Sequence, residues 1–142
     1  MRVFPVVAAL AAAAFAASAA SAETIKLTAT LIGPSETPPN DSKGTGALTG
    51  TYDTDTKTLA WTVEYSGLTG PATAAHFHGP APVGKPAPVL VPIVGSLASP
   101  FKGTATLNDD QAKALMDGMV YFNIHTDAHK AGEIRGQVEK AM

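Results

Sequence analysis

The chain has 142 residues, with 10 Lys and Arg against 12 Asp and Glu and a formal net charge of −2. This balance excludes the basic stripe that binding to nucleic acid or to an anionic membrane surface requires. Cysteine is absent, so disulfides, thiolate metal sites and a cysteine nucleophile are excluded as well. The length suits one domain with its own core.

The first 22 residues have the pattern of a secretory signal peptide. Arg2 is followed by an apolar run over residues 3–17, and Ala20-Ser21-Ala22 offers a small-x-small cleavage pattern. The run is too short and too rich in alanine for a membrane span, and no later run is long enough. We therefore expect a signal peptide at 1–22 and a single exported domain at 23–142, periplasmic or secreted. Without Arg2 the net charge changes from −2 to −3.

Most of the remaining chain is predicted to be strand. Apolar and polar residues alternate over 25–31, 47–52, 59–65 and 101–107, as in half-buried strands. The turn at 53–56 predicts that the second and third of these form a hairpin, which carries the aromatic part of the core. Five prolines between residues 80 and 92 predict an ordered surface loop that returns to the edge of a sheet.

A single helix is expected from about Asp109 to Asp117. Asn108 can cap it, Gln111 completes a capping box, and Gly118 is placed to end it. Strands are predicted again at 119–124 and 134–138. Many short strands separated by turns predict an all-β fold, an antiparallel sandwich or barrel with one short helix.

All four histidines fall in two clusters, His76 with His78 and His125 with His129. On a strand, the two rings of a His-x-His motif point to the same face. His125 falls on the more polar face of its own predicted strand, so the two clusters can converge if their polar faces meet at one end of the sandwich. Imidazoles from His76, His78 and His125 would then form a metal site with one open position. His129 can reach the same ion or a second one.

Five further residues are candidates for supporting this site. Glu36, Glu133 and Arg135 form one group, which either orients the imidazoles or ties a loop to a strand through an ion pair. Tyr121 is an outer ligand, a hydrogen-bond donor or a half-buried strand tyrosine. Asp127 lies between the two histidines of the second cluster and can orient them.

Three functions remain open from these residues. An imidazole-only site ranks copper(II) above its neighbours in affinity, so the first is binding of copper, and otherwise zinc, for metal handling or sequestration. In the second, the histidines are structural and the domain binds another exported protein or polymer. The third is a copper oxidoreductase, although no nucleophile elbow or phosphate-binding loop indicates an enzyme. A homodimer could complete an open coordination sphere, but nothing in the sequence requires it.

Four segments resemble the CHRD domain, a family named after chordin. They are LIGPSETPP at 31–39, AHFHGPA at 75–81, YFNIHT at 121–126 and GEIRGQV at 132–138. The resemblance implies an immunoglobulin-like or superoxide-dismutase-like β-sandwich, and it implies that the family's motif histidines are His76, His78 and His125. His129 stands where the family pattern calls for no histidine.

A fainter likeness is to copper–zinc superoxide dismutase. His-x-His followed by glycine, and the late strand at 132–136, are similar to segments of that enzyme. Its structural disulfide is impossible here without cysteine, and its bridging histidine has no clear counterpart. The likeness therefore implies a related copper site without dismutase activity.

Overall fold

The computed structural model describes residues 9–15 and 21–142. The predicted signal peptide at 1–22 therefore lies largely outside the described residues, since 1–8 and 16–20 are not among them. Residues 9–15 are exposed and have no regular secondary structure. Within the described ranges, no helix is both long and apolar enough to cross a membrane.

The domain is mostly strand, as predicted. In chain order its elements are β1 Thr24–Ile32, the 3-10 turn η1 Gly33–Ser35, β2 Thr45–Asp53, β3 Thr58–Ser66, β4 Ala72–His78, β5 Val89–Pro92, β6 Phe101–Thr106, α1 Asp109–Met116, β7 Tyr121–Thr126, β8 Ile134–Gln137 and β9 Glu139–Lys140.

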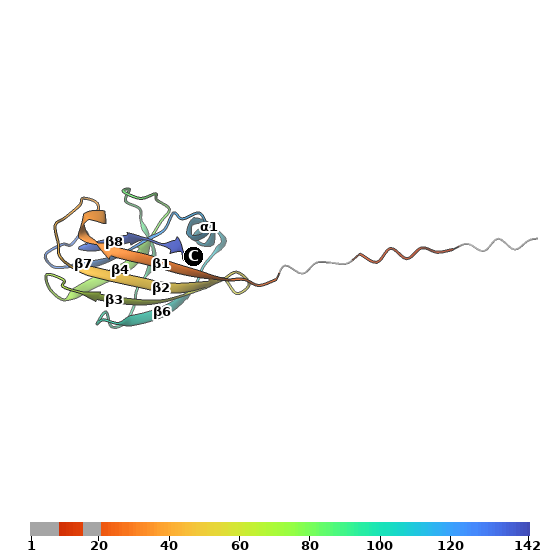
Figure 1. The fold of residues 1–142 in the computed structure, drawn as a ribbon, viewed down its shortest axis with the longest axis horizontal. Helices are drawn as coiled ribbons and strands as arrows, with labels where there is room; N and C mark the ends of the chain where they lie inside the picture. The colour runs from red at the N-terminus through yellow and green to blue at the C-terminus, as the bar shows by residue number, and fades with distance from the viewer. Residues whose placement is uncertain (1–8, 16–20) are drawn as a thin grey trace, which may run out of the picture.

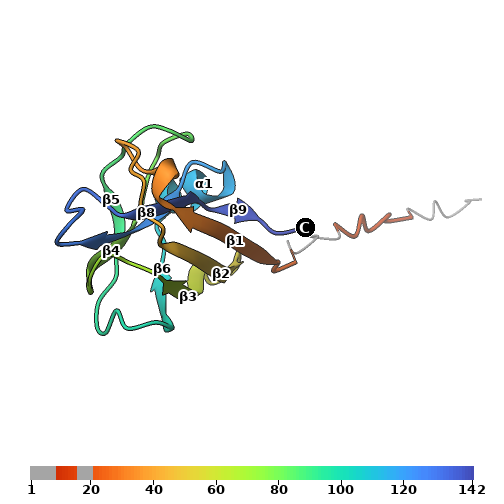
Figure 2. The ribbon, with the colours of Figure 1, turned by 60° about the vertical axis from the view of Figure 1, so that its left-hand side comes forward.

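All strand pairs are antiparallel, and the strands follow the order β5-β4-β7-β8-β1-β2-β3-β6, with β9 beside β1. Figure 1 shows β1, β2, β3 and β6 side by side, and Figure 2 shows β4 and β5 on the other part of the wrapped sheet. Aromatic contacts join the two halves: Trp61 meets Phe77 with centroids 5.1 Å apart, and Phe101 meets Phe122 at 6.3 Å. The sheet is thus nearly closed into a barrel-like sandwich.

The predicted alternation sets which side chains enter this core. In β1, Leu27, Ala29 and Leu31 are buried, while the residues between them face outward. The predicted hairpin is confirmed, since β2 and β3 pair over nine residues from Thr45↔Ser66 to Asp53↔Thr58. Burying one large apolar side chain stabilises the fold by about 1.5–3 kcal/mol. A shift of the strand pairing by one residue would turn these side chains to solvent and place threonines in the core.

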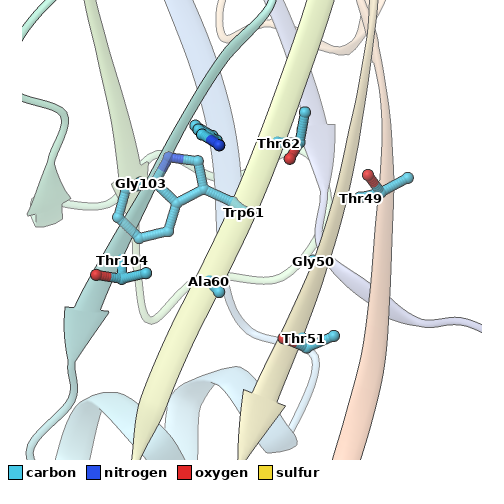
Figure 3. A pocket seen from close by; sticks show the side chains of 9 residues that line it. Thr49, Gly50, Thr51, Ala60, Trp61, Thr62, Gly103 and Thr104 are labelled. Carbon is cyan, nitrogen blue, oxygen red and sulfur yellow. The ribbon is translucent and has the colours of Figure 1, made fainter.

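Trp61 is flanked in register by two glycines, Gly50 and Gly103. A Cβ at Gly103 would lie 2.6 Å from the indole ring, so the tryptophan requires glycine there. The outer surface over these positions is a shallow hollow lined chiefly by small and hydroxyl-bearing residues from β2, β3 and β6 (Figure 3). Its lining holds neither a histidine nor a carboxylate, so the candidate chemistry lies elsewhere.

The predicted helix and its cap are confirmed. The Asn108 side chain accepts a hydrogen bond from the Gln111 N–H at 2.8 Å, and the Gln111 side chain accepts one from the Asn108 N–H at 2.9 Å. The helix ends at Met116, one residue before the predicted end, and Gly118 follows with φ of 72°. The proline-rich stretch also behaves as predicted, because it returns as the edge strand β5 beside β4.

Candidate metal centre

The two histidine clusters meet because β4 and β7 are neighbours in the sheet. The register pairs Ala74 with His125, His76 with Asn123 and His78 with Tyr121. The alternate residues of both strands, such as Phe77, are buried in the core. The histidines therefore share one face of a single sheet, which is a closer convergence than the meeting of separate faces that we considered from the sequence.

Three of the four histidines gather at one point. His76, His78 and His125 each offer a ring nitrogen, and these atoms all lie within 4.8 Å of one another. His76 Nδ1 and His125 Nε2 are 3.2 Å apart. His78 is 8% exposed, while the other two are half-buried, so the cluster lies at the surface but is partly shielded from water.

Backbone carbonyls fix the hydrogen position on two of these rings. His78 Nδ1 lies 3.0 Å from the Ala87 carbonyl oxygen, and His125 Nδ1 lies 2.8 Å from that of Lys130. A carbonyl oxygen only accepts, so each Nδ1 carries the hydrogen, and in the neutral ring Nε2 keeps its lone pair. A carbonyl partner on the far nitrogen is the usual arrangement behind a metal-binding histidine.

The surroundings favour neutral imidazoles. Burial lowers the pKa of His76, and the neighbouring His125 and His78 lower it further. Burial also lowers the pKa of His78, more than the hydrogen bonds to Ala87 and Asn123 raise it. Neutral rings at pH 7 bind a metal without first losing a proton.

A stack of side chains holds the His78 ring. The ring lies parallel to that of Tyr121, with an interplanar angle of 7° and centroids 4.7 Å apart. On Tyr121 lies the Arg135 guanidinium, with its Cζ 3.4 Å from the ring centroid. Tyr121 and Arg135 were candidates from the sequence, but the stack was not predicted. Its one sequence signal was that Tyr121 and His125 lie on the same face of one strand.

The predicted grouping of Glu36, Glu133 and Arg135 divides into separate environments. Within the part of the chain that the structure describes, Arg135 makes no ion pair within 4.0 Å with either carboxylate; its N–H groups donate to the Lys85 carbonyl at 2.9 Å and the Thr37 hydroxyl at 3.3 Å. The predicted ion pair between Arg135 and a glutamate is therefore wrong, because polar groups of the loops, not carboxylates, accept the hydrogen bonds of the guanidinium.

Glu133 ties loops to the sheet through groups other than Arg135. Its carboxylate accepts hydrogen bonds from the Ser42 hydroxyl at 2.8 Å, the Thr69 N–H at 2.9 Å and the Thr126 hydroxyl at 2.7 Å. Burial raises its pKa, but these hydrogen bonds outweigh burial and hold the pKa below its usual range. Its role is thus to join the segments that surround β7.

Glu36 lies in a different environment, close to the sheet face that carries the three histidines. It is 3% exposed, and its Oε1 has no hydrogen-bond partner among the residues that the structure describes. Burial raises its pKa from the ordinary 4.5 to about 7, with the Asn123 side chain and the Thr37 backbone opposing the rise. The structure thus places Glu36 behind Asn123, a residue that we had not singled out for the site.

Asn123 is the central residue that the sequence reasoning missed. It is 3% exposed, and its Oδ1 lies 2.9 Å from His78 Nε2 and 3.0 Å from His125 Nε2. Its place in β7, two residues before His125 and on the same face, was the available signal.

The remaining two candidates lie in the turn between β7 and β8. His129 is half-buried, and its backbone N–H donates to the Thr126 carbonyl at 3.1 Å. It is not among the three histidines whose ring nitrogens converge. Asp127 is exposed. The structure therefore separates the second cluster, bringing His125 to the site and leaving His129 in the turn.

Comparison with known proteins agrees with the motifs. Residues 27–138 match the CHRD domain. No curated protein and no solved structure matches the chain. The matched range covers most of the chain and contains Glu36, Asn123 and the three convergent histidines, so the chain belongs to the CHRD domain family.

Proposed function

We propose that this CHRD domain binds one transition-metal ion through His76, His78 and His125. Copper is the first candidate and zinc the second, and the role is handling or sequestration of the ion outside the cytoplasm. The observation that carries the proposal is the convergence of three ring nitrogens within 4.8 Å. The signal-peptide pattern at 1–22 supports export.

The geometry favours a ligand over a purely structural role for the cluster. Metal–nitrogen bonds of about 2.0–2.1 Å in a tetrahedral site place neighbouring ligand atoms about 3.3 Å apart. His76 Nδ1 and His125 Nε2 are 3.2 Å apart. Since His78 and His125 already donate from Nδ1 to carbonyl groups, their Nε2 lone pairs point into the cluster, and a cation there would replace the ring-to-ring hydrogen bond between His76 Nδ1 and His125 Nε2.

The three imidazole ligands favour copper(II) and zinc(II) as the metal but do not select one of them. Neutral imidazole suits copper(II) and zinc(II), and copper(II) binds such a site more strongly by the general order of affinities. No thiolate is present in the chain, so the site lacks the thiolate ligand that favours copper(I). We therefore place copper first on affinity, while the metal carried in the cell depends also on supply.

Calorimetric titration of the purified, metal-free protein with copper(II) and zinc(II) tests the proposal. We expect one equivalent to bind at micromolar concentration or tighter, about −8 kcal/mol or better. The double variant His76→Ala/His78→Ala should lose this binding. His129→Ala is the matched control, since it removes a histidine outside the cluster and should bind as the wild type does.

Thermal unfolding of each variant without metal establishes that it is folded. Equal weak binding by the wild type and the double variant would refute the metal site. The histidines would then be structural, and the domain would be an interaction module for another exported protein or polymer.

A further inference from the structure

Two rings of the cluster each face more acceptors than they can satisfy. Both nitrogens of His78 lie near oxygen atoms, Ala87 O at 3.0 Å and Asn123 Oδ1 at 2.9 Å. His125 repeats the pattern with Lys130 O at 2.8 Å and the same Asn123 Oδ1 at 3.0 Å. A neutral imidazole carries one N–H, and on each ring the backbone carbonyl takes it.

The consequence is a convergence of lone pairs. His78 Nε2 and Asn123 Oδ1, 2.9 Å apart, both present electron pairs to one small region. His125 Nε2 presents a third pair, and a hydrogen on His76 Nδ1 can donate to it at 3.2 Å. Buried polar atoms normally have partners, and leaving one unpaired costs about 1–3 kcal/mol. A proton on His78 Nε2 would satisfy that atom and Asn123 Oδ1, but it would leave a charged ring that is only 8% exposed. A metal cation bound between the three atoms satisfies all of them at once.

The groups around the Asn123 amide favour the orientation in which its oxygen faces the two histidine rings. A Cβ at Gly132 would lie 2.6 Å from Glu36 Cδ and 2.7 Å from Asn123 Nδ2, so the carboxyl group and the amide nitrogen both lie directly above this glycine. A carboxyl oxygen accepts from an amide N–H. Turning the amide by 180° would bring its oxygen to the carboxyl group, which is unfavourable when that carboxyl is ionised, and would take the oxygen donor away from the imidazoles.

We propose that Asn123 Oδ1 is the fourth donor of the metal site, and that Glu36 is a positioning residue that holds the amide in this orientation. This inference rests on the proposed function, because it completes the same site. Glu36 suits the role by its place: it is 3% exposed and has an oxygen, Oε1, without a partner.

The proposal changes what the site can do. Three imidazoles alone leave a fourth position for water or substrate, as in catalytic zinc sites. Three imidazoles and an amide oxygen fill a tetrahedral shell, as in structural sites. A closed shell agrees with holding the ion and disfavours the oxidoreductase, which needs a reachable position on the metal.

The test compares variants of Asn123 in the full protein, titrated with zinc(II) and copper(II). Asn123→Leu keeps a similar volume and removes the donor, whereas Asn123→Asp keeps an oxygen in place. We expect the leucine variant to lose affinity toward the upper end of the roughly 10- to 100-fold range seen when the support of a metal site is removed. The aspartate variant should retain wild-type affinity or exceed it. Asn123→Ser replaces the leucine variant if the latter does not fold.

The copper(II) electron paramagnetic resonance spectrum adds a readout that a merely structural role would not move. Loss of an equatorial oxygen donor in Asn123→Leu should change the copper hyperfine splitting, while His129→Ala should leave it unchanged. A leucine variant with wild-type affinity and an unchanged spectrum would overturn the proposal and leave the three-histidine site intact. A wild type that binds no metal would overturn both proposals.

Glu36 is tested by a pair of substitutions. Glu36→Gln keeps a carbonyl oxygen that can accept from the Asn123 amide, whereas Glu36→Leu removes it. We expect the leucine variant to bind copper(II) and zinc(II) about tenfold more weakly and to have an altered copper spectrum. The glutamine variant should keep the affinity and the spectrum of the wild type. Two variants that both match the wild type would overturn the positioning role.

Discussion

Glu36 and Glu133 are buried to nearly the same degree, at 3% and 0% exposure, and both approach β7 from the loops around it. Glu133 accepts hydrogen bonds from Ser42, Thr69 and Thr126. Glu36 keeps one oxygen without a partner beside the amide of Asn123. The pKa of Glu133 is accordingly held below its usual range, while that of Glu36 is raised to about 7.

The difference shows how burial alone fails to separate structural from functional carboxylates. A buried carboxylate surrounded by donors stabilises the fold, because its charge is satisfied and it satisfies others. A buried carboxyl with an unused oxygen costs stability, and such residues concentrate at functional sites. We therefore assign Glu133 to the fold and Glu36 to the proposed metal centre, and the variants below test that division.

The largest loss of folding stability is expected from Glu133→Ala. The substitution leaves the Ser42 hydroxyl, the Thr69 N–H and the Thr126 hydroxyl without their acceptor. Thr126 is fully buried, so its unsatisfied hydroxyl costs about 1–3 kcal/mol, whereas Ser42 is half-buried and Thr69 exposed, so water replaces much of what these two lose. We expect a total loss of about 2–4 kcal/mol. Urea unfolding measured at pH 7 gives the free energy.

Glu36→Ala is the matched control at equal burial. Its loss should be smaller, because only the Asn123 side chain and the Thr37 backbone depend on it, against the three donors around Glu133. Equal losses in the two alanine variants would break the division and place both carboxylates in the framework.

The second prediction concerns pH. Glu36 has a folded-state pKa of about 7, against 4.5 ordinarily, so between these values the folded protein holds a proton that the unfolded chain has released. Its contribution therefore makes the stability fall as the pH rises from about 4.5 to about 7, by up to about 3 kcal/mol. Glu36→Gln cannot ionise and should become the more stable protein above pH 7.

The measurement is the difference in unfolding free energy between Glu36→Gln and the wild type from pH 4.5 to 8, with a chelator present. His76 and His78 have lowered pKa values in the folded protein. Their contribution to the unfolding free energy is therefore present above about pH 6.5 and is lost as the pH falls from there through their folded-state pKa values. Because both proteins contain them, that contribution cancels in the difference. A difference that stays flat across this range would show that Glu36 is ionised normally in the folded protein.

Gly132→Ala probes the point where Glu36 and Asn123 meet. Gly132 has φ of 125°, a conformation that costs alanine about 1–3 kcal/mol in strain. The new methyl group would also press on the carboxyl and amide groups. We expect a loss of stability in that range, measured by urea unfolding, together with weaker zinc(II) binding measured by calorimetry.

Gly118→Ala is a suitable control for Gly132→Ala. Gly118 also has a positive φ, but a Cβ there would meet no atom within 4 Å. It should lose stability from strain and keep its metal affinity. Loss of affinity in both variants would indicate that general destabilisation, rather than displacement of Asn123, weakens the site.

Much of the fold could be predicted because its causes are local. Alternation along 25–31 and 59–65 reflects a sheet with one face in the core, and the prolines at 80–92 confine that segment to a loop and an edge strand. Parity also placed His76, His78 and His125 on the polar faces of their strands. Their convergence, however, depends on the pairing of β4 with β7, which the sequence left open.

The rest of the site depends on contacts between distant segments. Glu36 follows η1, and nothing in its own segment indicates that it reaches Asn123 across Gly132. The Ala87 carbonyl fixes the His78 tautomer from a loop whose path the sequence left undefined. Asn123 escaped notice because an amide on a strand has no distinctive spacing; its meaning comes from the two rings around it.

The smallest effect is expected from Asn108→Ala, at a feature that was predictable from the sequence. The substitution removes the side-chain acceptor for the Gln111 N–H at the start of α1 and should cost about 1 kcal/mol. Because α1 supplies none of the groups around the three histidines, copper(II) and zinc(II) affinity should match the wild type. Thermal unfolding and calorimetry on the same variant measure both quantities. A change in metal affinity would show that the site responds to stability in general, and the contrast between Glu36 and Glu133 would then need a double-mutant cycle to be upheld.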